Sequence, residues 1–182
     1  MKMYINEVGN LSLCEANEID ELIQKSQNEI VSTTHLLEHC RGMIDQLKML
    51  DLDNQLKNYN NQLLALLDEL IAKYIFLGHC WTYFGDPFSS NEAYSSALKL
   101  DQNNADVLTF IGRNYLQLGN YKKAKINLSK AFDLRPTDPM VLFYFAECFQ
   151  ASGEMELAEE KYRDVLKSGL TGFKDSQTIH IS

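Results

Sequence analysis

The residues in this chain most able to do chemistry are two histidines one helical turn apart. His35 and His39 stand at i, i+4 spacing, with Glu38 and Cys40 beside them. Two histidines on one helix face can each contribute a zinc ligand. The segment lacks a third ligand and the glutamate placement of a metalloprotease helix. We therefore interpret both as solvated surface histidines and expect no metal site.

No other group in the sequence indicates catalysis. His79 follows no acid and has only Cys80 beside it, and the chain has no glycine-rich phosphate loop, nucleophile elbow or carboxylate pair in an apolar context. The cysteines form no CxxC and no ligand-like spacing, which predicts free buried thiols in a reducing compartment. They are Cys14, Cys40, Cys80 and Cys148. We expect no catalytic residue, no cofactor and no enzyme activity.

Composition and charge exclude further classes. The chain has 182 residues, of which 45% are hydrophobic, and this is enough for one domain with a continuous core. Its net charge is -8. Residues 1–70 hold five Lys/Arg against twelve Asp/Glu, and no basic stripe follows, so nucleic acid is not an expected partner. The start lacks an apolar signal region, and no run approaches the ~20 apolar residues of a spanning helix. We expect a cytoplasmic protein without membrane insertion.

Residues 105–138 carry large and small residues in a fixed order that predicts two antiparallel helices. The order is Leu108, Ile111, Gly112, Tyr115, Ala124, Leu128, Ala131 and Pro136. Gly112 and Ala124 are expected where the two helices come closest, since a larger side chain would separate them. Matching patterns begin at Pro139 and, in degenerate form with Ser90 for the alanine, at Ile71. Three glycines recur at 34-residue spacing in the same turn: Gly85, Gly119 and Gly153.

This pattern resembles the tetratricopeptide repeat (TPR), a 34-residue helix-turn-helix that needs neighbours to bury its apolar face. The resemblance implies an all-α fold, a three-TPR right-handed α-solenoid preceded by a long N-terminal helical hairpin. We predict a loosely ordered segment at 1–11, a hairpin or cap over 12–70, repeats at 71–104, 105–138 and 139–172, and a tail at 173–182. The residues left after the third repeat are too few and too polar for a further capping helix.

Heptad spacing predicts the hairpin. A capping box over Ser12–Glu15 begins a long helix, whose apolar seam steps four and three residues with polar interruptions at Ser26 and Thr33. A second seam from Leu56 to Trp81 carries its helix into the first repeat. The two helices can pair within the chain, or the first seam can pair with its copy in a homodimer, as in a coiled coil. The candidate oligomerisation seam is Ile19, Ile23, Ile30, Leu37, Ile44 and Leu47.

In TPR arrays the first helix of each repeat lines a concave groove, and the resemblance places nine residues in a peptide-binding groove here. They are Ile75, His79, Tyr83, Thr109, Arg113, Leu116, Met140, Phe143 and Glu147. The apolar members would suit anchors of an extended segment. TPR co-chaperones that hold the acidic tail of heat-shock proteins use a Lys/Asn/Arg clamp; only Arg113 could serve, so this tail is not an expected ligand.

Residues 92–168 also resemble the TPR-type type III secretion chaperones that hold translocator proteins. The shared features are a helix that contains glycine and the run Ala146, Glu147 and Cys148 beside a turn that contains glycine. The resemblance implies a chaperone or escort that holds an extended client segment. The hairpin is longer than that family needs, and its C-terminal helix is lacking. The alternative is a structural adaptor that joins an assembly through its N-terminal heptads or its C-terminal end.

Overall fold

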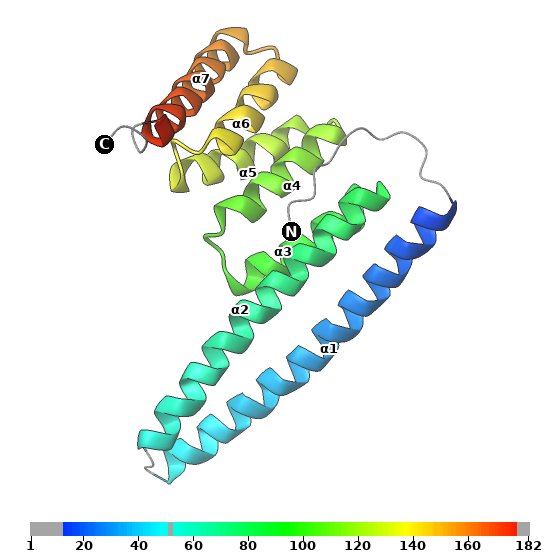
Figure 1. Cartoon of the computed structure of the whole chain (residues 1–182), viewed down its shortest axis with the longest axis vertical. Coiled ribbons are helices and arrows are strands. Elements are labelled where there is room, and N and C mark those ends of the chain that lie inside the picture. The colour runs from blue at the N-terminus through cyan, green and yellow to red at the C-terminus, as the bar shows by residue number, and fades with distance from the viewer. Residues whose placement is uncertain (1–12, 51–52, 178–182) are drawn as a thin grey trace. The chain divides into compact units, whose positions relative to one another are not determined.

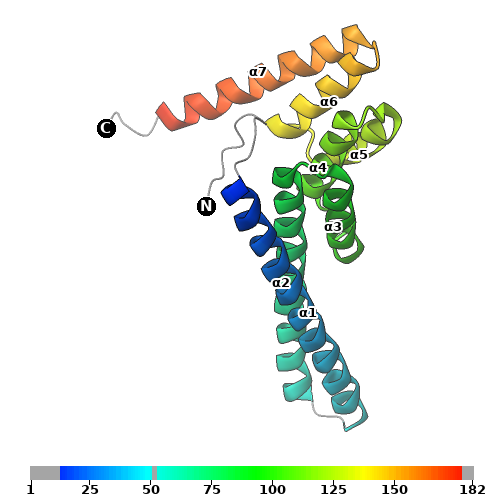
Figure 2. The ribbon, with the colours of Figure 1, turned by 90° about the vertical axis from the view of Figure 1, so that its right-hand side faces the viewer.

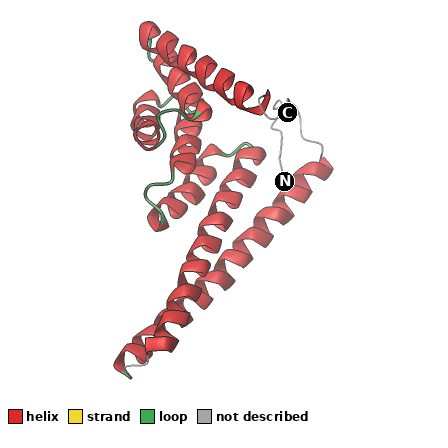
Figure 3. Ribbon diagram, turned by 60° about the vertical axis from the view of Figure 1, so that its left-hand side comes forward, coloured by secondary structure: helices red, strands yellow, loops and turns green. Residues whose placement is uncertain are grey.

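The computed structural model describes residues 13–50 and 53–177, and this part of the chain consists of helices and turns, without strands (Figure 3). The helices are α1 (Leu13–Met49), α2 (Asp53–Phe84), α3 (Pro87–Leu100), α4 (Ala105–Gln117), α5 (Tyr121–Leu134), α6 (Pro139–Ala151) and α7 (Met155–Gln177). The all-α prediction is confirmed. The predicted loose segment at 1–11 and the Ser12 end of the capping box lie outside the described residues, as do 178–182 of the tail.

The chain divides into two compact units, Met1–Asp101 and Gln102–Ser182. We call the first the hairpin unit, which holds α1, α2 and α3. The second is the repeat unit, which holds α4 to α7 (Figure 1). Each is described by itself below.

In the hairpin unit, α1 and α2 lie side by side and antiparallel (Figures 1 and 2). All six residues of the candidate oligomerisation seam are buried. Four of them, Ile19, Ile23, Ile30 and Leu37, share one apolar cluster with Leu70 and other side chains of α2. Burying such side chains contributes about 1.5–3 kcal/mol each. The seam is therefore occupied within one chain, and pairing with a second copy through it would have to displace α2.

A polar contact interrupts the seam at Thr33. Its hydroxyl donates to Glu29 O at 2.9 Å and accepts from Lys73 Nζ at 2.6 Å, and Lys73 also pairs with Glu69 at 2.7 Å. A buried polar group with one geometric solution specifies the register of two paired helices. Thr33 thus ties α1 to α2 at one register. Ser26, the other interruption, is buried with no hydrogen-bond partner for its Oγ.

The degenerate first repeat closes through polar and aromatic contacts. Ser90 stands where the later repeats have alanine, and its buried hydroxyl donates to Gly78 O at 2.9 Å and lies 2.7 Å from Thr82 Oγ1. The ring of Tyr94 fills the space that a Cβ on Gly78 would occupy. Serine is therefore tolerated because its hydroxyl is satisfied, and the glycine is required because an aromatic ring packs on it.

The repeat unit follows the 34-residue register. Asn120 and Asp138 cap α5 and α6 with their side chains, and Gly119 and Gly153 adopt positive φ in the two turns. Its apolar cluster joins Ala124, Leu128, Phe145, Cys148, Phe149 and Ala158. α7 runs as one helix from Met155 to Gln177, so it continues past the predicted end of the third repeat at 172 into the predicted tail.

Candidate functional site

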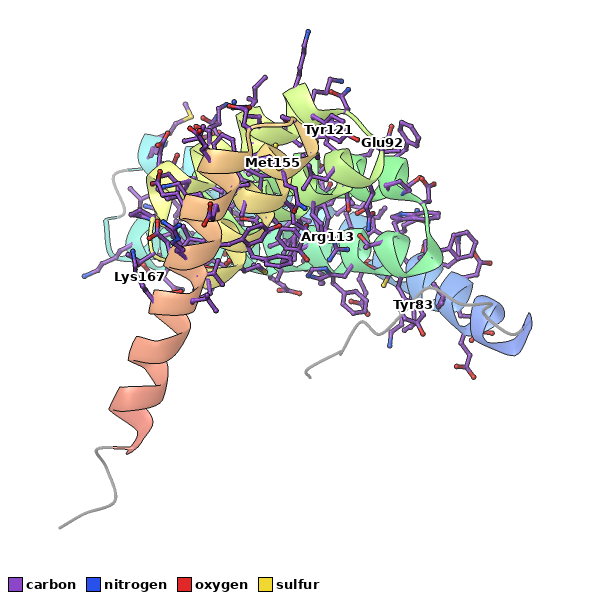
Figure 4. The ribbon with its side chains drawn as sticks, turned by 90° about the horizontal axis from the view of Figure 1, so that it is seen from above. Tyr83, Glu92, Arg113, Tyr121, Met155 and Lys167 are labelled. Atoms are coloured by element: carbon purple, nitrogen blue, oxygen red, sulfur yellow. The ribbon has the colours of Figure 1, made fainter. Side chains whose placement is uncertain are left out.

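The repeat unit brings five of the predicted groove residues onto α4 and α6, which pack against each other. α4 supplies Arg113 (labelled in Figure 4) and Leu116, and α6 supplies Met140, Phe143 and Glu147. Phe143 is 41% exposed, and the other four are half-buried. We call these five residues the α4–α6 face. It combines an exposed aromatic ring with two further apolar side chains and one charge of each sign.

Arg113 and Glu147 couple electrostatically across this face. Burial raises the pKa of the Glu147 carboxyl, and the positive charge of Arg113 acts in the opposite direction. The Nε of Arg113 is buried without a hydrogen-bond partner among the described residues. An unsatisfied donor of this kind is costly. This Nε is out of reach of a ligand from solvent, so Arg113 offers a ligand its positive charge and not this donor.

Aromatic side chains support Phe143 from α6 and α7. Phe143 makes edge contacts with Tyr144, with ring centroids 5.4 Å apart, and with Tyr162, at 6.1 Å. The Tyr162 hydroxyl donates to Gln150 Oε1 at 2.8 Å. Burial raises the pKa of Tyr162, and the negative charge of Glu147 adds to the effect. Sequence reasoning missed Tyr162 as a site residue because its repeat position is a packing position; the signal was its polar-tipped ring where the preceding repeat has Leu128.

Thr109 does not belong to this face, and its assignment to the groove is wrong. Its side chain is fully buried, and its hydroxyl donates to Ala105 O at 2.7 Å within α4. A threonine hydroxyl bonded to the carbonyl four residues earlier is already satisfied. Thr109 therefore packs in the interior and offers a ligand neither surface nor a free polar group.

The remaining three predicted groove residues lie on α2 in the hairpin unit. Tyr83 is 46% exposed, whereas Ile75 and His79 are half-buried. His79 Nδ1 lies 2.9 Å from Tyr94 Oη, and the two rings meet edge to face. His79 is thus held by packing and a hydrogen bond. Phe76, one heptad before Tyr83 and also exposed, was missed; the two lie on one side of α2.

The other candidate chemical groups occupy ordinary positions. His35 and His39 are exposed, and His35 lies 3.8 Å from Glu38. Within residues 13–50 and 53–177 no group of three metal-ligating side chains comes together. Cys40, Cys80 and Cys148 are buried free thiols, and Cys14 lies among side chains that are not described. Over the same residues no helix is long and apolar enough to cross a membrane.

Lys125 makes a charged contact between two repeats. Its Nζ donates to both carboxylate oxygens of Glu154, at 2.7 and 2.9 Å, and lies 4.9 Å from the ring centroid of Phe149. The contact joins α5 of the second repeat to the turn between α6 and α7 in the third. Two residues 29 positions apart carry no local signal of pairing, so only the stacking of the repeats reveals it.

Comparison with known families agrees with the 34-residue register. Residues 105–138 match the model of the tetratricopeptide repeat. The chain therefore contains a TPR. It is 33% identical over 92 residues to the BBSome complex member BBS4 of Bos taurus, and 31% identical over 106 residues to the protein O-mannosyl-transferase TMTC3 of Homo sapiens. These matches cover 50% and 58% of this chain but only 18% and 12% of the relatives, so the TPR protein spans less than a fifth of either.

Solved structures show the same fold. The crystal structure of MamA matches with a TM-score of 0.55 at 15% identity, over 91% of this TPR protein and 99% of that chain. The type III secretion translocator chaperone SycD of Yersinia enterocolitica gives 0.54 at 18%, over 59% and 80%. The second TPR of Spaghetti (RPAP3), bound to an HSP90 peptide, gives 0.51 at 18%, over 53% and 89%. At such identities the likeness concerns fold alone.

Proposed function

We propose that this TPR protein is a non-enzymatic cytoplasmic escort that binds an extended segment of a client protein on the α4–α6 face. The observation that carries the proposal is the exposed ring of Phe143, supported from behind by Tyr162 and flanked by the half-buried Leu116 and Met140. An exposed aromatic ring held by packing is a typical contact for an apolar side chain of a peptide, since the protein loses little conformational entropy on binding.

The charges on the face favour a mixed ligand over an acidic tail. Arg113 and Glu147 place opposite charges among the apolar groups, so a client segment with apolar anchors and a single polar or acidic contact to Arg113 fits best. The Lys and Asn of the clamp that holds the heat-shock protein tail have no counterpart here. Peptide binding by the Spaghetti repeat supports a peptide as the class of ligand, without supporting the same sequence.

A structural adaptor is the second candidate, and the outer surface of α1 favours it. Leu22, Val31 and Leu36 are each more than two-fifths exposed on this helix, outside the buried seam. Exposed apolar side chains are typical of protein contacts where they form one contiguous patch. An adaptor would join an assembly through this surface and leave the α4–α6 face unused.

The test compares two substitutions of matched exposure. Phe143→Glu places a charge at the proposed anchor, and Leu157→Glu does the same on α7, where Leu157 is 40% exposed. After equal helicity is verified by circular dichroism, each variant is used to capture clients from the native cytosol for mass spectrometry. Loss of one client with Phe143→Glu alone supports the escort; retention of every partner by both variants refutes it.

A further inference from the structure

The side of α5 that contacts the next repeat shows which side chains a helix needs to bind a following repeat. Leu128 is fully buried and belongs to the cluster that contains Phe145 and Phe149 of α6. Phe132 contacts Phe145, with ring centroids 5.6 Å apart, and Lys125 pairs with Glu154. One helix side of α5 therefore supplies two apolar groups and a cation, and the following repeat supplies apolar rings and a carboxylate.

The same places recur on α7, 34 residues later, with much greater exposure. Tyr162 replaces Leu128, and Leu166 replaces Phe132 and is 67% exposed; Met155, at the start of the same side and labelled in Figure 4, is 61% exposed. α7 also packs on α6, and Tyr162 takes part in that contact through Phe143 and Gln150, whereas Met155 and Leu166 remain largely exposed. We call Met155, Glu159, Tyr162 and Leu166, together with Glu147 of α6, the α7 outer surface. It repeats the geometry that a helix covers one repeat earlier.

Charge is reversed between the two surfaces. Where α4 and α5 have Arg113 and Lys125, α6 and α7 have Glu147 and Glu159. In the covered contact these two cations face Glu147 and Glu154 of the following repeat. A helix that covered the α7 outer surface in the same register would therefore have to bring cations. The present partner of Glu159 is Arg163 on the same helix, and both side chains are well exposed, so this pair is weak and exchangeable.

A second copy of the chain fits this surface poorly. A two-fold contact between copies is made by the same patch on both. It would place Glu159 and Glu147 of one copy near the same carboxylates of the other, and like charges brought together at an interface are unfavourable. The charge pattern selects a partner of opposite sign.

We propose that the α7 outer surface docks an amphipathic helix of a partner protein, with apolar residues set against Tyr162 and Leu166 and with Lys or Arg facing Glu147 and Glu159. Such a helix presents apolar side chains at i, i+3 or i+4 and i+7. The proposal goes beyond the escort function, because it concerns a different ligand conformation and a surface centred on α7.

The chain itself supplies a probe. A synthetic peptide of residues 104–120 has the sequence of α4, and the repeat register sets its Arg113 opposite Glu147 and its residue 120 opposite Glu159. With Asn120→Lys, the peptide carries both cations that the surface selects. A fluorescent form is titrated with the full-length protein and followed by anisotropy, with the Arg113→Glu peptide as the charge-reversed control. We expect the basic peptide to bind at least five-fold more tightly than the control, because reversing Arg113 replaces one weak ion pair with a repulsion from Glu147.

Variants of the protein locate the binding. Leu166→Asp is expected to weaken the peptide roughly ten-fold or more, as the loss of one buried leucine would, and Glu159→Lys about five-fold. Leu157→Asp and Glu160→Lys make the same changes on other sides of α7 and are expected to leave binding unchanged. All four positions are exposed, so helicity should be equal.

Three results would overturn the proposal. The first is that the basic peptide does not bind. The second is that Glu159→Lys and Glu160→Lys weaken its binding equally, which would mean that only net charge matters. The third is that analytical ultracentrifugation shows a dimer that Leu166→Asp dissociates, which would assign the surface to a second copy. Client capture through the α4–α6 face is measured separately with Phe143→Glu, so the two proposals can fail independently.

Discussion

Substituting Gly112 with alanine tests whether α4 and α5 can approach each other this closely only because Gly112 has no side chain. A Cβ at Gly112 would lie 2.5 Å from Leu128 Cγ and 2.8 Å from its Cδ2. Because Leu128 is fully buried, it has no solvent into which to move. Overpacking of this kind costs about 1–3 kcal/mol, whereas alanine gains about 1 kcal/mol in helix propensity over glycine. The net free energy of unfolding should fall by up to about 2 kcal/mol.

Gly42 provides the matched control, since it is also within a helix and a Cβ there would meet nothing within 4 Å. Gly42→Ala should raise the free energy of unfolding by up to about 1 kcal/mol. The difference between the two substitutions cancels helix propensity and isolates the clash, expected at about 1–3 kcal/mol. Denaturant unfolding followed by circular dichroism gives both values, and amide hydrogen exchange assigns each to its unit.

A second substitution examines the contact itself. Leu128→Ala removes the atoms that the new Cβ would strike, so Gly112→Ala should cost less in that background, with a coupling energy on the order of 1 kcal/mol. If Gly112→Ala stabilises the protein as much as Gly42→Ala does, the neighbours yield without cost. The argument that glycine is required for this close approach would then be refuted.

Three further predictions concern caps, turns and the contact between repeats. Asp86→Ala should lower the free energy of unfolding by about 0.5–2 kcal/mol because the side chain caps α3. The Ser89 hydroxyl and nearby amides lower the pKa of Asp86. The contribution of Asp86 to stability is therefore present above its unfolded-state pKa and should disappear as the pH falls through the lowered folded value, which an acid titration of stability checks. Gly119→Ala should cost about 1–2 kcal/mol because φ is +68° there, with Gly119→Asn costing less in the same denaturant assay; equal costs would contradict the backbone explanation. Lys125→Ala should cost at most about 1 kcal/mol, and added salt should shrink this difference, because the Glu154 pair is partly exposed; a salt-independent loss would indicate packing on Phe149 instead.

Much of the site lay within reach of the sequence because a repeat carries its own register. The assignment of Arg113, Phe143 and Glu147 to one face needed only the place of each within its 34 residues. The assignment of Thr109 was wrong because the same rule assumes that every groove position of a repeat is exposed to solvent. The exposure of a side chain depends instead on what its neighbours leave uncovered. Tyr162 was missed for the converse reason: a position that normally packs is left partly exposed in the third repeat.

Local chemistry determined the helices and their turns. The recurrence of Gly85, Gly119 and Gly153 located three turns that adopt positive φ, since backbone conformation is decided by neighbouring residues. The heptad steps of α1 likewise fixed which side chains would be buried. Tertiary structure alone decided what buries them: α2 of the same chain covers the seam that could have met a second copy. It also decided that Lys125 meets Glu154 and that Tyr94 fills the space above Gly78, because contacts between distant residues follow from how helices stack, which no local pattern encodes.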